Sequence, residues 1–553
     1  MLRMGSPERR IGATHLLAAL LVGFGGDPPI RMEARRLDGF VHENGACGRR
    51  FLVETMGSGV ALFDADGDGD LDLYLVNGAP LPCCAPGRGA RPVDRFFENA
   101  GGGVFRDATE RSGLGDPSYG MGVAVGDVEG DGDADLYVTN FGPNRLYRNR
   151  GDGVFQEATG AARVGDPGWG SSAAFADLDA DGDLDLFVCN YLDFTIETHR
   201  DCTAANGIPV YCDPDAYGRV RNVLYRNGGD GTFADATELA DVALPGKALG
   251  VLAADLDDDA DVDLYVANDG VENFLFRNRG DGRFVEDALL AGVAFGETAL
   301  GEAGMGVTGG DADGDGRLDL FVTNLSGELN AFYRNLGGGL FGYASHSAGL
   351  GHPSLLDTGF GAEFADFDLD GDLDLLVANG HVLDNAEAVS DVTRSRQRHR
   401  LFRNDGGTFR EVDALPAEAS EGFGRGLAVG DVDGDGRPGA VLTHCGEAPV
   451  LYRNASPEGG AVTLRLAGAR SNRDGLGARI EARLGGRRLV REVAGGGSYL
   501  SHSDRSVLLG LGRADRLDDV TVRWPSGRLD RLGSLLAGVR LVVSETGSSP
   551  SPR

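Results

Sequence analysis

Short runs of alternating apolar and polar residues, separated by turns rich in glycine, asparagine and aspartate, recur along most of the chain. In one unit the glycine-rich apolar run Gly120–Gly126 is followed by an acidic turn, the run Asp135–Asn140 and the Leu-Tyr-Arg-Asn run Leu146–Asn149. A further short run around Phe155 ends the unit, so each unit predicts four short β-strands. Because a four-stranded sheet cannot bury both of its faces alone, such units must stack against one another.

The spacing of the units predicts how many sheets the chain forms. Seven units follow one another, and the starts of their acidic turns are 50 to 78 residues apart. Four-stranded repeats at such intervals are more typical of a β-propeller than of a sandwich. Near residue 456 the acidic turns stop, while alternating runs continue. The sequence therefore predicts an all-β protein with a seven-bladed β-propeller over residues 30–455, a small β domain over residues 456–546 and a polar tail over residues 547–553.

The two ends of the predicted propeller complement each other. After Asn454 the seventh unit lacks its last strand, and the segment Phe40–Asn44 lies ahead of the first acidic turn. We expect a strand near Phe40 to complete the seventh sheet, which would join both ends of the propeller and remove an exposed sheet edge.

The acidic turn within each unit follows the pattern Asp-x-Asp-x-Asp-Gly-x-x-Asp. Oxygen ligands at every second residue, with a glycine that allows a sharp turn, suit a hard cation. Ca²⁺ takes about 6–8 oxygen ligands in irregular geometry, whereas Mg²⁺ demands a stricter octahedron. We expect side-chain ligands from positions 1, 3, 5 and 9 and a backbone carbonyl from position 7. The sequence thus predicts about five to seven structural calcium ions that hold adjacent strands together.

The predicted ligands fall into seven groups, one for each turn in chain order. They are Asp64, Asp66, Asp68, Asp70 and Asp72; Asp127, Glu129, Asp131, Asp133 and Asp135; Asp177, Asp179, Asp181, Asp183 and Asp185; Asp255, Asp257, Asp259, Asp261 and Asp263; Asp311, Asp313, Asp315, Arg317 and Asp319; Asp366, Asp368, Asp370, Asp372 and Asp374; and Asp431, Asp433 and Asp435.

Two turns depart from the pattern. Ala260 replaces the glycine of the fourth turn, and a residue with a β-carbon is strained in a left-handed conformation. Gly439 removes the carboxylate at position 9 of the seventh turn. We expect both sites to bind metal more weakly, and five or six sites to be well occupied.

The charge distribution narrows the choice of partners. The net charge of −33 is concentrated in the seven acidic turns, which carry 33 acidic side chains, whereas residues 456–553 hold 16 arginines against 10 acids. A negative field of this size disfavours nucleic acids and anionic membrane surfaces as partners. No stretch after residue 29 is long and apolar enough to span a membrane.

The N-terminal region predicts export. Three arginines precede the short apolar run Leu16–Phe24, a pattern typical of a signal peptide within residues 1–29. We expect the protein to be secreted, periplasmic or held at the cell surface. In such a compartment Cys202 and Cys212, ten residues apart, could form a disulfide. Cys189 and Cys445 lie in apolar strand contexts and are expected in the core.

The most specific motifs of the chain lie near its C-terminus. They are Ser471–Ile480, Gly497–Ser501, Leu509–Gly512 and Arg523–Gly527. Together with the repeats, they resemble the FG-GAP/VCBS-repeat proteins that end in an ASPIC/UnbV domain, the cartilage acidic protein-like family. The resemblance covers nearly the whole chain after residue 30 and implies an extracellular seven-bladed propeller with integrin-like calcium loops. It implies little about activity, because a fold does not fix a function.

Two histidines are candidates for a catalytic role. His381 follows a predicted strand within an Asn-Gly-His sequence, and His444 occupies the equivalent place in the seventh unit. Both could line one face of the propeller, and either could instead cap a loop by hydrogen bonds. The sequence contains no HExxH motif, phosphate-binding loop or other linear motif that would assign a reaction.

Two functional hypotheses follow. The first is a secreted binding module that presents the long loops 78–95, 190–222 and 380–400 to an extracellular protein or glycan. The second is an enzyme of secondary metabolism or polymer processing with its site in the propeller channel, since the resemblance includes UnbV, a name from enediyne gene clusters. One deep apolar pocket joining His381, His444 and carboxylates would favour the enzyme. A channel lined by glycine, valine and alanine would favour binding.

Overall fold

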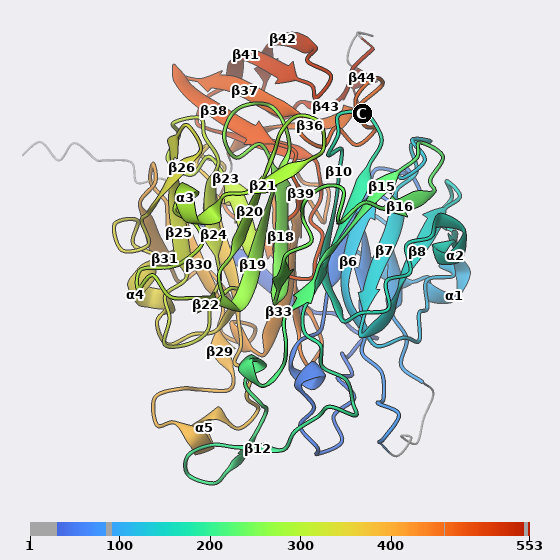
Figure 1. The fold of residues 1–553 in the computed structure, drawn as a ribbon. Helices are drawn as coiled ribbons and strands as arrows, with labels where there is room; N and C mark the ends of the chain where they lie inside the picture. The colour runs from blue at the N-terminus through green and yellow to red at the C-terminus, as the bar shows by residue number, and fades with distance from the viewer. Residues whose placement is uncertain (1–29, 85–90, 458, 547–550, 553) are drawn as a thin grey trace, which may run out of the picture.

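The computed structural model describes residues 30–84, 91–457, 459–546 and 551–552 (Figure 1). The predicted signal peptide and most of the predicted polar tail lie outside the described residues. The described chain is all-β, with seven repeated four-stranded antiparallel sheets and two further four-stranded sheets near the C-terminus. The predicted all-β class is confirmed. None of the described helices has the length and hydrophobicity needed to cross a membrane.

The elements have the following bounds. In the order of their units, the repeated sheets consist of β2 (Val60–Phe63), β3 (Asp72–Leu75), β4 (Arg95–Asn99) and β5 (Phe105–Asp107); β6 (Gly120–Gly126), β7 (Asp135–Asn140), β8 (Gly142–Asn149) and β9 (Phe155–Glu157); β10 (Gly170–Ala176), β11 (Asp185–Asn190), β15 (Val223–Asn227) and β16 (Phe233–Asp235); β18 (Ala248–Ala254), β19 (Asp263–Val271), β20 (Phe274–Asn278) and β21 (Phe284–Glu286); β23 (Val307–Gly310), β24 (Asp319–Val322), β25 (Ala331–Gly337) and β26 (Leu340–Tyr343); β27 (Gly359–Ala365), β28 (Asp374–Asn379), β30 (Arg400–Asn404) and β31 (Phe409–Val412); and β33 (Gly424–Gly430), β34 (Gly439–His444), β35 (Val450–Asn454) and β1 (Met32–Arg36). The short helices are η1 (Leu52–Thr55), α1 (Thr109–Ser112), α2 (Thr159–Ala162), η2 (Pro214–Ala216), α3 (Ala288–Ala291), α4 (Gly351–Ser354) and α5 (Ala386–Val389). The remaining short strands are β12 (Cys202–Thr203), β13 (Pro209–Val210), β14 (Val220–Arg221), β17 (Pro245–Gly246), β22 (Glu302–Ala303), β29 (Gln397–Arg398), β32 (Glu421–Gly422) and β39 (Gly495–Gly496).

The first strands of the repeated sheets lie side by side in chain order. Strand β2 contacts β6, and the series continues through β10, β18, β23 and β27 to β33, which lies beside β2 again. Glycine allows this close approach, because a β-carbon on Gly122 would lie 2.8 Å from the carbonyl oxygen of Ser171 in the next sheet. The contacts between sheets therefore return from the seventh sheet to the first.

An asparagine at the end of each third strand strengthens the contact between neighbouring sheets. Asn149 Nδ2 donates a hydrogen bond to Ala65 O of the preceding sheet at 2.7 Å. In the first sheet, Asn99 Nδ2 donates to Val432 O of the seventh at 2.9 Å. The repeated asparagine thus joins each sheet to the acidic turn of the sheet before it.

The seventh sheet takes its outer strand from the start of the described chain. Strand β1 pairs antiparallel with β35, with Met32 opposite Asn454. The N-terminal segment completes this sheet, as expected, but the strand ends at Arg36, so the prediction of a strand near Phe40 was wrong in position. Phe40 instead follows the strand and packs in the buried cluster between the first and seventh sheets. Backbone pairing, and not a long apolar run, holds β1 in place.

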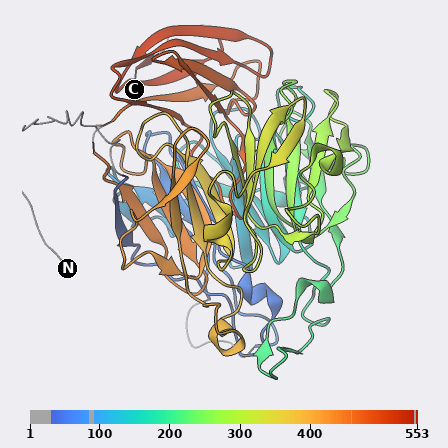
Figure 2. The ribbon, with the colours of Figure 1, turned by 90° about the vertical axis from the view of Figure 1, so that its left-hand side faces the viewer.

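The C-terminal part of the described chain, called the C-terminal domain, forms two sheets at one end of the repeated sheets. One sheet contains β36 (Gly460–Ala467), β40 (Val507–Gly512), β43 (Arg540–Ser544) and β44 (Ser551–Pro552); the other contains β37 (Arg479–Leu484), β38 (Arg487–Glu492), β41 (Arg516–Arg523) and β42 (Leu529–Leu536). Figures 1 and 2 show these orange and red strands covering one end of the molecule. That end carries the acidic turns and is called the turn face. The opposite end, with β12 and α5, is called the insertion face.

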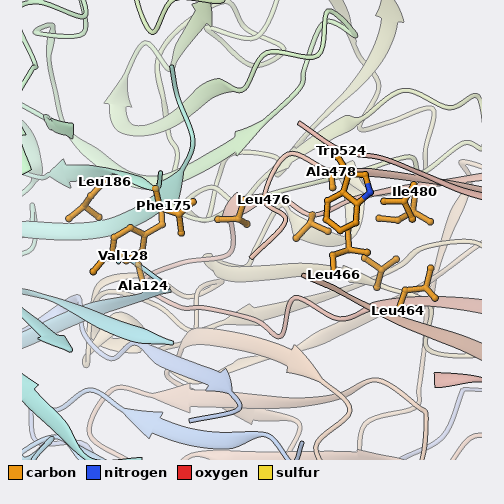
Figure 3. Close-up of a cluster of buried hydrophobic side chains, with 14 of the residues drawn as sticks. Ala124, Val128, Phe175, Leu186, Leu464, Leu466, Leu476, Ala478, Ile480 and Trp524 are labelled. Atoms are coloured by element: carbon orange, nitrogen blue, oxygen red, sulfur yellow. The ribbon is translucent and has the colours of Figure 1, made fainter. Parts of the chain in front are cut away.

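One hydrophobic core joins the C-terminal domain to the repeated sheets. Phe175 and Leu186 of the third sheet belong to the same buried cluster as Leu466 and Trp524 of the C-terminal domain. Figure 3 shows Leu476 between these two groups of side chains. The C-terminal domain is therefore packed onto the turn face by apolar contacts, and its burial contributes to the stability of both parts.

A segment of the C-terminal domain enters the space enclosed by the first strands. This segment, Gly495–Ser506, is called the plug. Its strand β39 pairs with β18, Leu500 O accepts a hydrogen bond from Val123 N at 3.1 Å, and Asp504 N donates to Val429 O at 3.0 Å. These partners lie on the fourth, second and seventh sheets. The plug thus satisfies backbone groups of strands from several sides of the channel.

The tip of the plug fills the channel with a large side chain. Tyr499 is fully buried, and its hydroxyl donates a hydrogen bond to Met56 O at 3.0 Å. Its ring packs against Phe360 of the sixth sheet with the ring centroids 4.9 Å apart. The channel is therefore occupied by the protein's own chain.

The insertion face carries long loops held by disulfides. The hairpin of β12 and β13 is closed by the disulfide Cys202–Cys212, which confirms the predicted pair. A second disulfide joins Cys47 to Cys84. Of the two cysteines expected in the core, Cys189 is buried and Cys445 is only partly buried.

Candidate metal centres

Each acidic turn folds around its own carboxylates. In the sixth turn, Asp366 Oδ2 accepts a hydrogen bond from Gly371 N at 2.9 Å, and Asp370 Oδ1 accepts one from Asp372 N at 2.9 Å. Gly371 has a φ of +97°, in the left-handed region that favours glycine. Equivalent bonds recur in the second and seventh turns. The glycine and these bonds turn the chain so that alternate side chains face one another.

Three carboxylates converge in at least five of the turns. In the first, third, fourth and fifth turns, one oxygen from each of positions 1, 3 and 5 lies within 4.8 Å of the others. In the sixth turn the converging residues are Asp366, Asp368 and Asp374. Two oxygens on opposite sides of one calcium ion, each at about 2.3–2.6 Å, are separated by up to about 5 Å. The clusters therefore have the dimensions of a calcium site.

Several of these carboxylate oxygens lack a partner that would compensate for their burial. The Oδ1 atoms of Asp177, Asp311 and Asp366 are buried and have no hydrogen-bond partner among the described residues. Burial, followed by neighbouring carboxylates, raises the pKa of Asp177 to about 7 and that of Asp366 to about 8. A divalent cation would supply the missing positive charge and the missing ligand interactions, so this all-oxygen donor set fits Ca²⁺.

The aspartate at position 9 also holds the backbone of the turn. In the sixth turn, Asp374 accepts hydrogen bonds from Phe367 N and Asn404 N, both at 2.9 Å. The first five turns repeat both bonds. Each carboxylate oxygen keeps a second lone pair, so position 9 can hold the turn and bind a cation. Gly439 has no side chain, so the seventh turn lacks both of these hydrogen bonds.

The arginine of the Leu-Tyr-Arg-Asn run is a functional residue that sequence analysis missed. In the third sheet, Arg226 Nη1 lies 2.9 Å from Asp179 Oδ2 at position 3 of the turn, and Arg226 Nη2 donates to Gly282 O of the next sheet at 2.6 Å. The same ion pair to position 3 is made in five other sheets by Arg148, Arg277, Arg334, Arg403 and Arg453. The sequence did carry a signal for this contact, because the same arginine recurs in the units that contain the acidic turns.

The fourth turn has the backbone conformation that its sequence predicted. Ala260, at the position of the usual glycine, has a φ of +79°, and Asp258 has a φ of +65°. These left-handed conformations cost about 1–2 kcal/mol for a residue with a β-carbon. The three carboxylates of this turn nevertheless converge as in the others.

In the seventh turn, each acidic side chain pairs with an arginine. Arg540 Nη2 lies 2.8 Å from Asp431 Oδ2, and Arg437 Nη1 lies 3.0 Å from Asp435 Oδ2. Asp433 pairs with the arginine of β35. Guanidinium groups thus supply the positive charge that this turn needs, at a site that also lacks the position 9 carboxylate.

The C-terminal domain sets further arginines against the acidic turns. Arg465 Nη1 lies 2.7 Å from Asp64 Oδ2 of the first turn, and Arg487 Nη1 lies 2.8 Å from Asp372 Oδ1 of the sixth. The excess of arginine in the C-terminal domain, noted from its sequence, therefore faces the excess of aspartate in the turns. This charge complementarity orients the domain on the turn face.

The two candidate histidines lie in different places. His444 is buried with its Nε2 3.0 Å from His399 Nε2, and burial lowers the pKa of both rings. His381 lies on the insertion face, where its Nδ1 accepts a hydrogen bond from Leu383 N at 2.9 Å. That bond is the loop-capping role considered from the sequence. The structure does not bring the two histidines into one pocket, and the plug occupies the channel between the sheets.

Glu363 is an ionisable group in the channel whose pKa is shifted. Ser503 Oγ of the plug donates to its Oε1 at 2.6 Å, and Thr308 Oγ1 donates to its Oε2 at 3.1 Å. Burial raises the pKa of Glu363 to about 7, above its ordinary value of 4.5. Because the folded-state pKa is the higher one, this carboxyl contributes stability below pH 4.5 that is lost as the pH rises through about 7.

The Glu363→Gln variant is therefore expected to lose less stability than the native chain when the pH is raised. Between about pH 6 and pH 8 the difference should amount to about 1–2 kcal/mol, because one unit of pKa corresponds to about 1.4 kcal/mol and the group is partly exposed. Urea unfolding at both pH values measures this. Glu418→Gln, at an exposed position, is the matched control. Equal pH dependence in the native chain and Glu363→Gln would contradict the expectation.

These features define a class of protein: an all-β chain of repeated four-stranded sheets, each with an acidic turn, capped by a basic β domain. A family model described as FG-GAP-like repeat matches residues 64–138, 127–188, 255–322 and 311–377. A model described as ASPIC and UnbV matches residues 468–550. The chain therefore carries FG-GAP-like repeats and an ASPIC and UnbV domain, as its motifs predicted.

The curated relatives that match the chain share the name cartilage acidic protein 1. Cartilage acidic protein 1 of Homo sapiens is 28% identical over 329 residues, which are 57% of this chain and 46% of that protein. Cartilage acidic protein 1 of Xenopus tropicalis is 28% identical over 295 residues, 51% of this chain and 42% of that protein. The chain thus spans about half the length of the curated relatives that it matches.

Two solved structures resemble the fold at a low level. A lectin of Agrocybe aegerita, described as recognising non-reducing terminal N-acetylglucosamine, is 16% identical with a TM-score of 0.41, over 76% of this chain and 96% of that one. BBS1N in complex with ARL6DN is 10% identical with a TM-score of 0.38, over 74% of this chain and 97% of that one. At these TM-scores neither similarity bears on function.

Proposed function

We propose that this protein is an exported, calcium-stabilised, seven-bladed β-propeller that binds an extracellular protein or glycan through its insertion face. The observation that carries the proposal is the contrast between the two ends of the molecule. The C-terminal domain covers the turn face, whereas the insertion face presents loops from several units (Figure 2). The metal centres and the recognition surface thus lie at opposite ends.

The arrangement of the repeated sheets supports a closed propeller. The first strands contact one another in a series that returns from β33 to β2. The hydrogen bond from Asn99 to the seventh sheet closes the same series, and β1 gives the seventh sheet its fourth strand. A closed ring with a plugged channel is a rigid scaffold on which loops can differ without altering the core.

The donor sets support calcium as the structural ion. Five turns bring three carboxylates together, and oxygens of several of them are buried without a hydrogen-bond partner. The seventh turn differs, because Gly439 leaves it without the position 9 carboxylate and each of its three acids pairs with an arginine. We infer that about five or six turns hold calcium and that the seventh holds none, with the ions fixing the join between the first two strands of each blade.

Disulfides and the exposed loops support an extracellular role. Two disulfides pin the insertion loops, and disulfides persist mainly in oxidising compartments. Rigid loops on a rigid ring lower the entropy cost of binding a partner. The enzyme hypothesis has less support, because the channel is filled by Tyr499 and the plug, and His444 does not line the pocket that His381 lines.

The binding proposal is tested with arrays of extracellular glycans and matrix proteins probed with the full chain in calcium. We expect saturable binding to at least one class of target. The variant Arg200→Glu/Arg394→Glu, which reverses two exposed charges on the insertion face, should weaken that binding about tenfold or more. Arg163→Glu, exposed beside α2, is the matched control and should have no effect. Absence of binding, or binding that only the control variant weakens, would refute the proposal.

A further inference from the structure

A pocket of about 460 Å³ opens on the insertion face at the end of the plugged channel. The base of the pocket is formed by Leu249, Met305 and Phe360, which lie at or next to the starts of β18, β23 and β27. Leu52 and Met56, in and beside η1, line another side. Pockets of about 300–1,000 Å³ with mostly apolar walls are typical of sites for small molecules.

The base of the pocket is held rigidly. The guanidinium group of Arg425 stacks over the ring of Phe360, 4.0 Å from its centroid, and is fully buried. Arg425 Nε donates to Thr55 O at 2.7 Å, and Arg425 Nη2 donates to His381 O at 3.2 Å. Tyr499 of the plug packs against the same phenylalanine. These contacts form the pocket before any ligand arrives, which lowers the cost of binding.

Two insertion loops close over the pocket from opposite sides of the propeller. The hairpin of β12 and β13 contributes both disulfide cysteines to the lining, and the loop before α5 contributes Val382 and Leu383. Asn206 Nδ2 donates to Ala388 O, and Asn385 Nδ2 donates to Pro209 O, both at 3.0 Å. The two loops therefore meet through a few exposed hydrogen bonds, which can open to admit a ligand and re-form over it.

Among the polar side chains that line this largely apolar space, His381 and Asp269 have hydrogen-bonding capacity left for a ligand. His381 Nδ1 accepts a hydrogen bond from Leu383 N, so the neutral ring carries its hydrogen on Nε2 and can donate it to a ligand. Burial lowers the pKa of His381 to about 4, so the ring is neutral at pH 7. Asp269 accepts the hydroxyl of Tyr191 and also lines the pocket, where it can accept a second hydrogen bond. The pocket thus offers a donor in His381 and an acceptor in Asp269, with the carboxylate of Asp213 also in its lining.

We propose that this pocket binds a small, uncharged, largely hydrocarbon molecule that carries a hydroxyl group. The apolar walls favour the hydrocarbon part, and a hydroxyl can accept a hydrogen bond from His381 or donate one to Asp269. A carboxylate would meet the negative charge of Asp269, and any charged ligand would lose its hydration in the pocket. This binding does not depend on whether a macromolecule binds the surrounding loops.

Three matched probes test the chemistry of the ligand: 2-naphthol, naphthalene and 2-naphthoate. Fluorescence titration of the full chain in calcium should give saturable, one-site binding of 2-naphthol. We expect naphthalene, which lacks the hydroxyl, to bind at least about fivefold more weakly, and 2-naphthoate at least about tenfold more weakly. Absence of saturable 2-naphthol binding, or tighter binding of 2-naphthoate, would overturn the proposal.

Variants then locate the site. Val382→Trp should fill the pocket from a loop and weaken 2-naphthol binding at least about tenfold, and His381→Phe should weaken it about fivefold while naphthalene binding changes little. Leu289→Trp adds the same ring at an exposed position on α3 and should change neither. Melting temperatures confirm that each variant is folded. The proposal would be refuted if 2-naphthol still bound the Val382→Trp variant. It would also be refuted if the native chain were a dimer that Val382→Trp dissociates, because a second copy of the chain would then occupy the pocket.

Discussion

Removing calcium with excess EGTA is expected to lower the melting temperature of the full chain by about 15–30 °C. An ion present at about 100 times its dissociation constant stabilises the folded chain by about 2.7 kcal/mol, so five such sites contribute about 13 kcal/mol. In a large chain each kcal/mol corresponds to about 2 °C. Without the ions, a buried carboxylate such as Asp177 or Asp366 is repelled by the other carboxylates of its own turn. Thermal unfolding with and without EGTA, together with calcium content by mass spectrometry, measures the effect.

Two matched variants assign the ions to individual turns. Asp366→Asn removes a charge from a turn whose carboxylates converge, and it should reduce the calcium content by about one ion per chain. Asp431→Asn makes the same change in the turn that Arg540 already neutralises, and it should leave the calcium content unchanged. A melting temperature that is insensitive to EGTA, or equal loss of calcium from both variants, would show that the turns are not calcium sites of the proposed kind.

The repeated features of the molecule were predictable from its sequence because they depend on local patterns. The period of the strands, the acidic turns and the left-handed backbone at Ala260 follow from residue types within about ten positions of one another. The disulfide Cys202–Cys212 was also predicted, since it closes a short loop. The position of β1 was not, because that strand is held by backbone pairing with β35, and the more apolar segment around Phe40 gave the stronger signal.

The contacts between the C-terminal domain and the repeated sheets were not predictable from local patterns. In the sequence, the plug has the composition of a polar, glycine-rich turn. Its hydrogen-bond partners lie up to several hundred residues away along the chain. Its signal was indirect: Gly59 stands in an apolar strand context where a β-carbon would lie 2.2 Å from Leu500 O of the plug. The pairing of acidic turns with Arg465 and Arg487 had a similar signal, in the opposite charges of the two regions. Only the fold brings such distant residues together.

A chain that ends at Ser456 is expected to melt at least about 10 °C below the full chain, or to aggregate. Removal of the C-terminal domain exposes the part of the shared core that contains Phe175 and Leu186, and it empties the channel where Tyr499 is fully buried. It also takes Arg465 away from the acidic turns, which increases their repulsion. Thermal unfolding and sedimentation in calcium measure the loss.

A point variant keeps this expectation testable if the shortened chain does not fold. Tyr499→Ala leaves both sheets of the C-terminal domain intact but creates a cavity in the channel, which should cost about 3–5 kcal/mol of the free energy of unfolding. Leu529→Ala, exposed on β42, is the matched control and should cost less than about 0.5 kcal/mol. If Tyr499→Ala were as stable as the control, and the shortened chain kept its melting temperature and its calcium, the C-terminal domain would be an independent module. The plug would then be a passive filling of the channel, whereas the contacts described above make it part of the structure that holds the seven sheets together.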